Sequence, residues 1–197
     1  RLQIFMKKNQ SFSKKLNIPT IYVGYDSREQ SAYNVLRYTA LKFSSSPINI
    51  YPIDQDKLRR LGVYRRAWLL GSSQKPFPKN KNDIQHVDLF DQRPFSTDFS
   101  FTRFLVPFLN RLSGWALYMD CDMYFRSDPI EIFNKYNDPK KAIYCVKHLY
   151  KPSERIKMYG AKQIKYSRKN WSSLVLYNCS HPSHNNFTVD DVNTKPG

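Results

Sequence analysis

The sequence predicts a single α/β domain in which a mainly parallel central sheet is flanked by helices. The chain has 197 residues and is 41% hydrophobic and 15% aromatic, which is enough for a core and excludes intrinsic disorder as its main state. Residues 20–53 show a strand–helix–strand pattern typical of a βαβ unit with parallel strands. The near-continuous apolar run Trp115–Met119 predicts a central strand that is buried on both faces.

The βαβ unit begins after a polar, basic segment. Residues 1–17 are expected to form an arm or linker, which places the domain at residues 18–197. The β-branched and aromatic run Thr20–Tyr25 is the first predicted strand. Ser27 is expected to cap the next helix, with Gln30 completing the capping pattern.

That helix carries small, apolar and threonine side chains at a spacing of three to four residues. They are expected to form its buried stripe: Ala32, Val35, Leu36, Thr39 and Ala40. The segment Ser44–Pro47 ends the helix, and Ile48–Ile53 reads as the second strand.

The middle of the chain is expected to contain a long loop and a second helix. Residues 71–98 carry three prolines and no sustained period, so we predict mostly loop there. Residues 100–112 are predicted to be a helix that Pro107 can kink and that Gly114 ends. Its expected apolar face consists of Phe101, Phe104, Leu105, Phe108, Leu109 and Leu112.

Three shorter elements follow the central strand. Pro129–Tyr136 is predicted to be a short helix, and Ala142–Val146 and Ser173–Tyr177 are predicted to be strands. The basic residues 147–169 show no clear period.

The net charge of +16 predicts polyanionic partners, such as nucleic acid, anionic lipid or phosphorylated small molecules. Ten bases and one acid lie in residues 140–169, and a smaller basic run covers residues 57–66. A charge run of this kind is also compatible with an ordinary solvated surface. The longest apolar run has five residues, far below the roughly 20 that cross a bilayer. Three widely spaced cysteines, Cys121, Cys145 and Cys179, favour a reducing, cytoplasmic setting.

Two carboxylates follow the central strand directly, in the sequence Asp120-Cys-Asp122. On an extended backbone, residues two apart project to the same face. Ligands of open α/β sheets bind at the carboxyl ends of such strands, and paired carboxylates suit Mg²⁺ or Mn²⁺ completed by phosphate oxygens and water. The alternative interpretation is a surface turn in which the aspartates cap a helix.

Two further residues are candidates for the same site. Asp26 also ends a strand and precedes a helix, so it can either accept hydrogen bonds from a base or ribose or simply cap the helix. Arg103 lies among apolar neighbours before the central strand. It is either a paired structural arginine or a cation positioned toward a diphosphate or sugar.

Together these residues resemble the GT-A glycosyltransferases, most closely the family-eight type related to glycogenin and bacterial galactosyltransferases. The resemblance rests on the Arg-bearing segment Phe101–Pro107, the block Trp115–Pro129 with its DxD motif, and the opening Tyr22–Arg28. Residues 170–178 are similar to the family's late segment, in which an Asn-Ala-Gly-like turn touches the sugars. The likeness covers most of residues 20–180, and only the DxD block is specific.

The resemblance implies a GT-A, Rossmann-like domain and a role for each matching residue. Asp120 and Asp122 would bind Mn²⁺, or Mg²⁺, on the donor diphosphate, with Asp122 and Arg103 as the candidate catalytic residues. Asp26 would contact uracil, with Gly24 and Tyr25 lining the nucleotide pocket. Arg103 would hold the donor, and Ser172 and Ser173 would face the transferred sugar or the acceptor.

Two departures from the family pattern matter. The turn reads Trp171-Ser-Ser here, so the sugar preference cannot be transferred. The family's third metal ligand, a histidine in a C-terminal motif, has no counterpart before Gly197. We therefore expect either that the domain lacks its C-terminal end or that His148, His181 or His184 substitutes.

These observations lead to the hypothesis of a metal-dependent hexosyltransferase that moves a sugar from a UDP-sugar to an unknown saccharide, lipid-linked or protein acceptor. Lys147 and Lys169 are expected to add cations near the leaving diphosphate. No carboxylate stands out as a general base, which fits a retaining reaction.

Two other functions stay open: a non-catalytic sugar-nucleotide-binding GT-A domain, and a basic nucleic-acid-binding protein. The second lacks any RNP-like, zinc-finger or helix-turn-helix signature, so no nucleic-acid partner is expected. A cytoplasmic location is predicted, with possible peripheral contact at the inner, anionic membrane surface.

Overall fold

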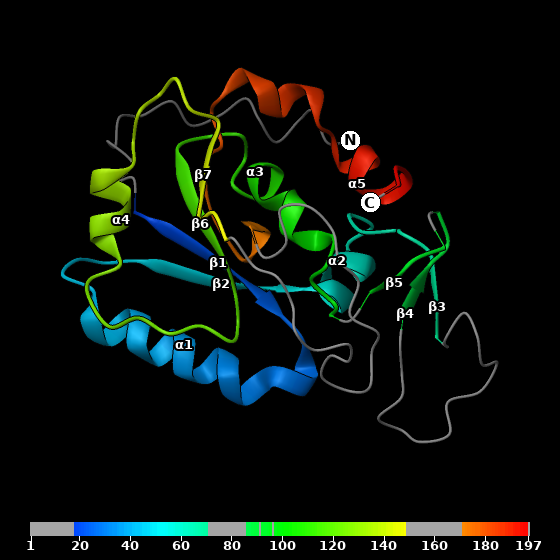
Figure 1. Cartoon of the computed structure of the whole chain (residues 1–197), viewed down its shortest axis with the longest axis horizontal. Helices are drawn as coiled ribbons and strands as arrows, with labels where there is room; N and C mark the ends of the chain where they lie inside the picture. Colours follow the sequence, from blue (N-terminus) through cyan, green and yellow to red (C-terminus); the bar gives the residue numbers. More distant parts are fainter. Residues whose placement is uncertain (1–17, 71–85, 91, 96, 149–170, 197) are drawn as a thin grey trace, which may run out of the picture.

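A computed structural model describes residues 18–70, 86–90, 92–95, 97–148 and 171–196. Its centre is a five-stranded sheet with helices on both faces, which confirms the predicted α/β class (Figure 1). None of the helices in these ranges is long and apolar enough to cross a membrane. The strand order is β2 (Asn49–Asp54), β1 (Thr20–Tyr25), β6 (Trp115–Asp120), β8 (Leu174–Asn178) and β7 (Ile143–Cys145).

The sheet is mixed, so the expectation of a mainly parallel sheet is confirmed only in part: β2, β1, β6 and β7 point the same way, and β8 points the opposite way. Strand β1 runs parallel to both of its neighbours, β2 and β6. Strand β8 runs antiparallel to both β6 and β7. All five strands were predicted close to their observed positions, but hydrophobic periodicity carries no information about strand direction. Only the connections between strands decide which way each one runs.

The central strand β6 supplies side chains to cores on both sides of the sheet. Leu117 and Met119 pack in the cluster that α1 (Gln30–Phe43) covers, together with Phe133 of α4 (Ile130–Lys135). Ala116 and Tyr118 pack on the opposite side, against a 3₁₀ turn η3 (Thr102–Leu105) and α3 (Val106–Leu109). Residues 116–119 are all buried, which confirms the predicted central strand.

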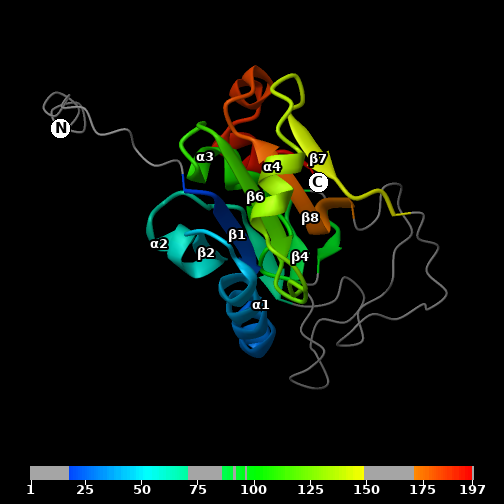
Figure 2. The same ribbon diagram turned by 90° about the vertical axis from the view of Figure 1, so that its left-hand side faces the viewer.

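Helix α1 differs from its prediction in its start and in its buried face. Asp26, not Ser27, caps the chain there: its side chain accepts a hydrogen bond from the backbone of a 3₁₀ turn η2 (Ser27–Glu29), and the α-helix begins only at Gln30. The buried residues are Tyr33, Leu36 and Ala40, whereas Val35 of the predicted stripe is 53% exposed. The helix is rotated so that Tyr33 faces the sheet. Figures 1 and 2 both show α1 below the sheet.

The helix predicted at residues 100–112 is divided in two. The 3₁₀ turn η3 comes first, and Pro107 then lies in the first turn of the short helix α3 rather than kinking a longer one. Arg111 and Leu112 have positive φ angles, which ends the helical path before Gly114. Three residues of the predicted apolar face are consequently exposed: Phe104, Phe108 and Leu112.

A small second sheet lies where mostly loop was predicted. Strands β3 (Trp68–Leu70), β4 (His86–Asp88) and β5 (Pro94–Phe95) pair in antiparallel order, so the loop prediction is wrong for residues 86–88 and 94–95. Residues 71–85 of that predicted loop, and the predicted arm 1–17, lie outside the described residues. A short helix α2 (Gln55–Arg60) follows β2, and α5 (Val189–Thr194) lies near the end of the chain.

Candidate functional site

The carboxyl ends of β1 and β6 lie side by side and bring most of the predicted site residues to one edge of the sheet. Gly24 pairs with Asp120 in the register of these parallel strands. The chain leaves β1 through Asp26 and leaves β6 through Asp122. Arg103 of η3 and Ser172 of the 3₁₀ turn η5 (Trp171–Ser173) lie at the same edge, where Arg103 donates hydrogen bonds to Ser172.

Asp120 is held from two sides. The hydroxyl of Tyr118, two residues earlier on the same face of β6, donates to Asp120 Oδ1 at 2.7 Å. Arg103 Nη1 lies 3.4 Å from the same oxygen. Burial raises the pKa of Asp120, and the charge of Asp122 adds to this, while Arg103 and the Tyr118 hydrogen bond oppose it; the pKa stays above its ordinary value. This carboxylate is therefore positioned rigidly in a place that favours additional positive charge.

Asp122 differs from its partner because β6 ends at Asp120. Cys121 and Asp122 form a turn, so the expectation that both carboxylates extend from one straight strand is wrong. Asp122 is exposed and makes no hydrogen bond or ion pair with the part of the chain that the structure describes. Its nearness to Asp120 shows in the charge effect on the Asp120 pKa.

Two neighbouring carboxylates, one fixed and one open to solvent, fit Mg²⁺ or Mn²⁺ whose other ligands are phosphate oxygens and water. No group of three His, Cys, Asp or Glu side chains arranged to hold a metal occurs within the described ranges. Two of the candidate third ligands have local roles instead. The His181 ring accepts from the Ser183 backbone at 3.2 Å, and His184 lies 3.3 Å from the Ala142 carbonyl.

Arg103 is buried and bridges three segments of the site. Its Nη1 donates to both the carbonyl and the hydroxyl oxygen of Ser172, each at 3.0 Å, and its Nε donates to the Phe99 carbonyl at 3.2 Å. Its guanidinium carbon lies 5.3 Å from the centre of the Tyr118 ring. Arg103 is thus a paired arginine, as one of the two predictions had it, and its partners are themselves candidate site residues. Ser173, the next residue, lies close enough to Asp120 to lower the pKa of its carboxyl.

Asp26 is only 1% exposed, and neighbouring residues of the protein already hydrogen-bond its carboxylate. It accepts hydrogen bonds from the backbone and side chain of Arg28, with which it forms an ion pair, and from the backbone N–H of Asp98 at 3.3 Å. Burial raises the pKa of Asp26, but the hydrogen bonds and charge of Arg28 outweigh it and hold the pKa below its ordinary value. This geometry favours the capping alternative for Asp26, since the uracil contact would have to displace Arg28.

Gly24 is required where it stands because β1 passes very close to its neighbours. A Cβ atom at this position would lie 2.3 Å from the Tyr118 hydroxyl oxygen and 2.7 Å from the Phe99 ring. The neighbouring Tyr25 is half-buried, and its ring packs edge-on against Tyr33 of α1 at 5.5 Å. The predicted lining residues are therefore at the site edge, with Gly24 serving close packing.

Sequence reasoning missed three participants. Arg28 pairs with Asp26, Asp98 lies against the same carboxylate, and Glu29 accepts a hydrogen bond from the thiol of Cys121 at 2.8 Å. Burial and the charge of Asp26 raise the pKa of Asp98 to about 6. Glu29 and Cys121 are 92 residues apart, so no local pattern could have indicated this link between the two strand ends.

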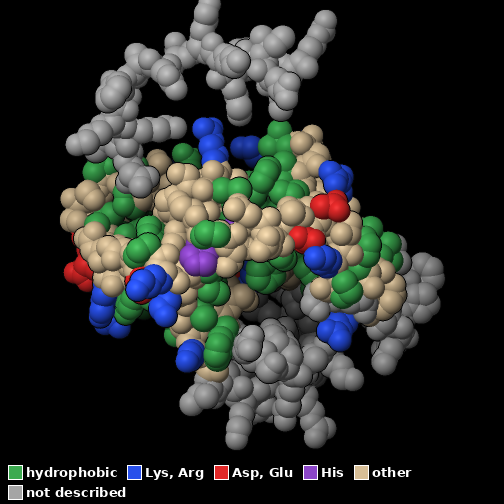
Figure 3. Space-filling view, turned by 90° about the horizontal axis from the view of Figure 1, so that it is seen from above, with side chains coloured by type: hydrophobic (Ala, Val, Ile, Leu, Met, Phe, Trp, Pro, Cys, Tyr) green, Lys and Arg blue, Asp and Glu red, His purple; other side chains and the backbone are tan. Residues whose placement is uncertain are grey.

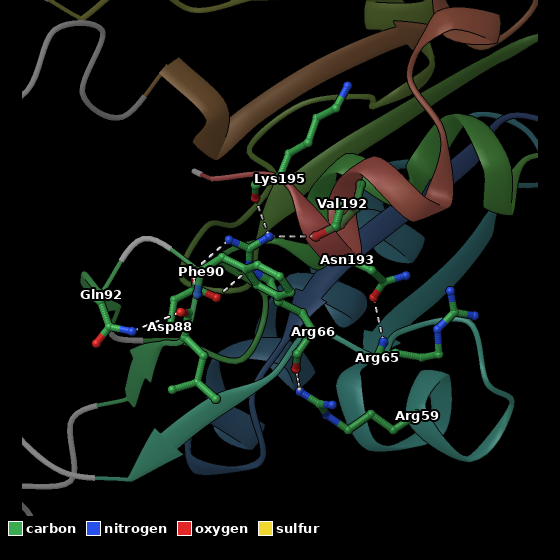
Figure 4. A network of polar contacts seen from close by, with 10 residues as sticks. Arg59, Arg65, Arg66, Asp88, Phe90, Gln92, Val192, Asn193 and Lys195 are labelled. Carbon is green, nitrogen blue, oxygen red and sulfur yellow. Dashed lines mark hydrogen bonds and ion pairs between the residues drawn. The ribbon is translucent and has the colours of Figure 1, made fainter.

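The predicted basic contributions are only partly visible. Lys147 is exposed just after β7, whereas Lys169 lies outside the described residues. Arg66 of the 57–66 run is not a surface base, because it forms a buried ion pair with Asp88 (Figure 4). Figure 3 shows Lys and Arg side chains dispersed over one face of the described chain rather than gathered into a single track.

Comparison with known proteins finds a curated relative of this chain. The chain is 42% identical over 177 residues to a protein named Protein CDI from Arabidopsis thaliana, and the match covers 90% of this chain and 59% of that protein. The chain thus spans about three fifths of the length of the curated relative it matches. No protein-family model matches the chain. No solved structure matches it either.

Proposed function

We propose that this chain is the donor-binding part of a metal-dependent glycosyltransferase, which moves a sugar from a UDP-sugar to a saccharide, lipid-linked or protein acceptor. One observation carries the proposal. Asp120 ends the buried central strand, is fixed by Arg103 and Tyr118, and is followed at once by the exposed carboxylate of Asp122. Such a pair, at the carboxyl edge of a sheet, suits a cation that carries a diphosphate.

Each residue of the edge has a distinct task in this proposal. Asp120 and Asp122 would hold Mn²⁺ or Mg²⁺, and the cation would neutralise charge that develops on the leaving diphosphate. Arg103 positions Asp120 and Ser172 relative to each other, since one Nη1 contacts both. Ser172 and Ser173 lie beside Asp120 and would face the sugar. Lys147 would add positive charge from the end of β7.

A cytoplasmic setting belongs to the same proposal. It is supported by the three cysteines of the described chain, all of which are free thiols. Cys121 and Cys179 are buried, and burial is the main cause that raises the pKa of each, which keeps both thiols protonated and unreactive.

Titration calorimetry with UDP, in the presence and absence of MnCl₂, tests the proposal directly. We expect binding that requires Mn²⁺ and that Asp122→Asn weakens by roughly a hundredfold, because a charged metal contact typically contributes a few kcal/mol. Glu131→Gln is the matched control, since it neutralises an exposed carboxylate on α4. Equal binding by wild type and Asp122→Asn would overturn the metal assignment.

A second readout separates the enzyme from its alternative. Hydrolysis of a panel of UDP-sugars should be Mn²⁺-dependent in the wild-type chain and lost in Asp122→Asn. Mn²⁺-dependent UDP binding without any hydrolysis or transfer would favour a non-catalytic sugar-nucleotide-binding domain. Binding that falls steeply with salt and ignores Mn²⁺ would favour a nucleic-acid binder instead.

A further inference from the structure

The outward face of α1 is unusual for a helix on the surface of a domain. It carries three exposed apolar side chains: Val35, Tyr38 and Leu41 are 53%, 63% and 47% exposed. Because successive members are three residues apart, they line one side of the helix. Figures 1 and 2 both place α1 at the lower boundary of the described chain, with the sheet above it. These side chains therefore form an apolar stripe opposite the one that packs on the sheet.

The two charged side chains of α1 itself are both positive. Arg37 and Lys42 are exposed on the same outward side, and residues 30–48 contain no Asp or Glu. The Lys42 ammonium lies 5.8 Å from the Tyr38 ring, so base and aromatic group adjoin. With Asn34 they surround an open hollow of about 450 Å³.

The loop 124–126 beside α1 also carries exposed aromatic and basic side chains. The backbone N–H of Phe125 donates to the Thr39 hydroxyl at 3.1 Å, so the loop that follows Asp122 runs along the flank of α1. Tyr124 is 61% exposed and Arg126 is exposed in this loop. It contributes one more tyrosine and one more base next to the candidate metal site.

We propose that the outward face of α1, with the loop 124–126, binds the surface of an anionic lipid membrane. An aliphatic and aromatic stripe bordered by Lys and Arg is the composition of helices that lie in the headgroup region of a bilayer. The absence of acids from residues 30–48 and the net charge of +16 fit a negative surface. This inference does not rest on the proposed sugar transfer, and either can fail without the other.

Cosedimentation of the full chain with vesicles tests it, using phosphatidylcholine alone and phosphatidylcholine mixed with phosphatidylserine. We expect pelleting only with phosphatidylserine, weakened by salt. Arg37→Gln/Lys42→Gln should lower the partition coefficient by roughly tenfold or more, because each base near such a surface contributes about 1 kcal/mol. Tyr38→Ser/Leu41→Ser should lower it by about tenfold, since two apolar groups no longer insert.

Two matched double variants control for charge and for apolar surface. Lys140→Gln/Lys141→Gln removes two exposed bases elsewhere, and Phe108→Ser/Ile143→Ser removes two exposed apolar side chains away from α1. Both should pellet like the wild type. The proposal is wrong if wild type stays in the supernatant, or if the control pairs lose as much binding as the α1 pairs. A dimer without vesicles that Tyr38→Ser/Leu41→Ser dissociates would also overturn it, because the face would then join two copies of the chain.

Discussion

Two Arg–Asp pairs in this molecule differ in how completely the surrounding protein buries them. Arg66 and Asp88 are each 1% exposed and are joined by two hydrogen bonds, of 2.6 and 2.7 Å. Arg103 and Asp120 are 11% and 16% exposed, with a single 3.4 Å contact. Figure 4 shows the first pair enclosed between the small sheet and the end of the chain. The second stands at an edge of the main sheet beside an open carboxylate.

In the buried Arg66–Asp88 pair, the arginine makes further contacts with the surrounding protein. Arg66 Nη1 also donates to the carbonyls of Val192 and Lys195, at 2.9 and 2.7 Å, and the ring of Phe101 stacks 3.9 Å from its guanidinium carbon. The pair thereby ties the β4 strand to α5. The Arg103–Asp120 pair positions one carboxylate and leaves the neighbouring carboxylate of Asp122 exposed. An ion pair that leaves room for a ligand is a better candidate site than the stronger, sealed one.

The largest expected effect comes from breaking the sealed pair. Arg66→Met leaves the buried Asp88 carboxylate without its cation and two carbonyls without their donor. It should lower the free energy of unfolding by about 3–5 kcal/mol, as measured by urea denaturation. The control is Arg65→Met, next in the chain, whose exposed 3.2 Å contact with Asp190 should contribute less than about 1 kcal/mol. Equal losses in both variants would contradict the distinction.

A smaller effect is expected at Asp98, beside the open edge. Its pKa is raised to about 6, so the protonated form stabilises the fold fully below the ordinary pKa of 3.8, and that stability is lost as the pH rises through 6. Asp98→Asn should therefore raise the free energy of unfolding at pH 7.5 by about 1–2 kcal/mol, with solvent screening allowed for.

The pH series provides the check on Asp98. Wild type and variant should converge in stability near pH 4, where the wild-type carboxyl is already protonated. A difference that is the same at pH 4 and pH 7.5 would show that the substitution acts through packing rather than through charge.

The smallest stability effect is expected at the looser pair. Asn at position 120 can still accept the Tyr118 hydrogen bond, and the partly exposed Arg103 contact is long. Asp120→Asn should change the free energy of unfolding by less than about 1 kcal/mol. The same variant should lose Mn²⁺-dependent UDP binding in calorimetry. Severe unfolding with intact ligand binding would reverse the roles assigned to the two pairs.

Much of the framework was predictable because it depends on local patterns. All five strands of the main sheet, helix α4 and the burial of residues 116–119 follow from short apolar runs between turn residues. The candidate edge was predictable for the same reason, since Asp26 and Asp120 lie where such runs end. The short strands β4 and β5 were missed because three or fewer residues hold no measurable period.

Long-range contacts decided what the local patterns could not. The direction of β8 was not predictable, nor was the rotation of α1 toward Tyr33, because either choice satisfies the same spacing of apolar residues. The partner of each charge is equally invisible in sequence: Arg66 meets Asp88 across 22 residues, and Arg103 meets Ser172 across 69.

The sequence by itself thus determined the α/β class, the buried central strand and the carboxylates at its end, because each of these depends on residues that are close together in the sequence. Only the tertiary structure decided that Asp26 pairs with Arg28, that Arg103 and Tyr118 both contact Asp120, and that α1 presents a second apolar stripe outward. The physical reason is that burial and ion pairing are properties of packed surfaces, and a chain acquires those surfaces only when distant segments meet.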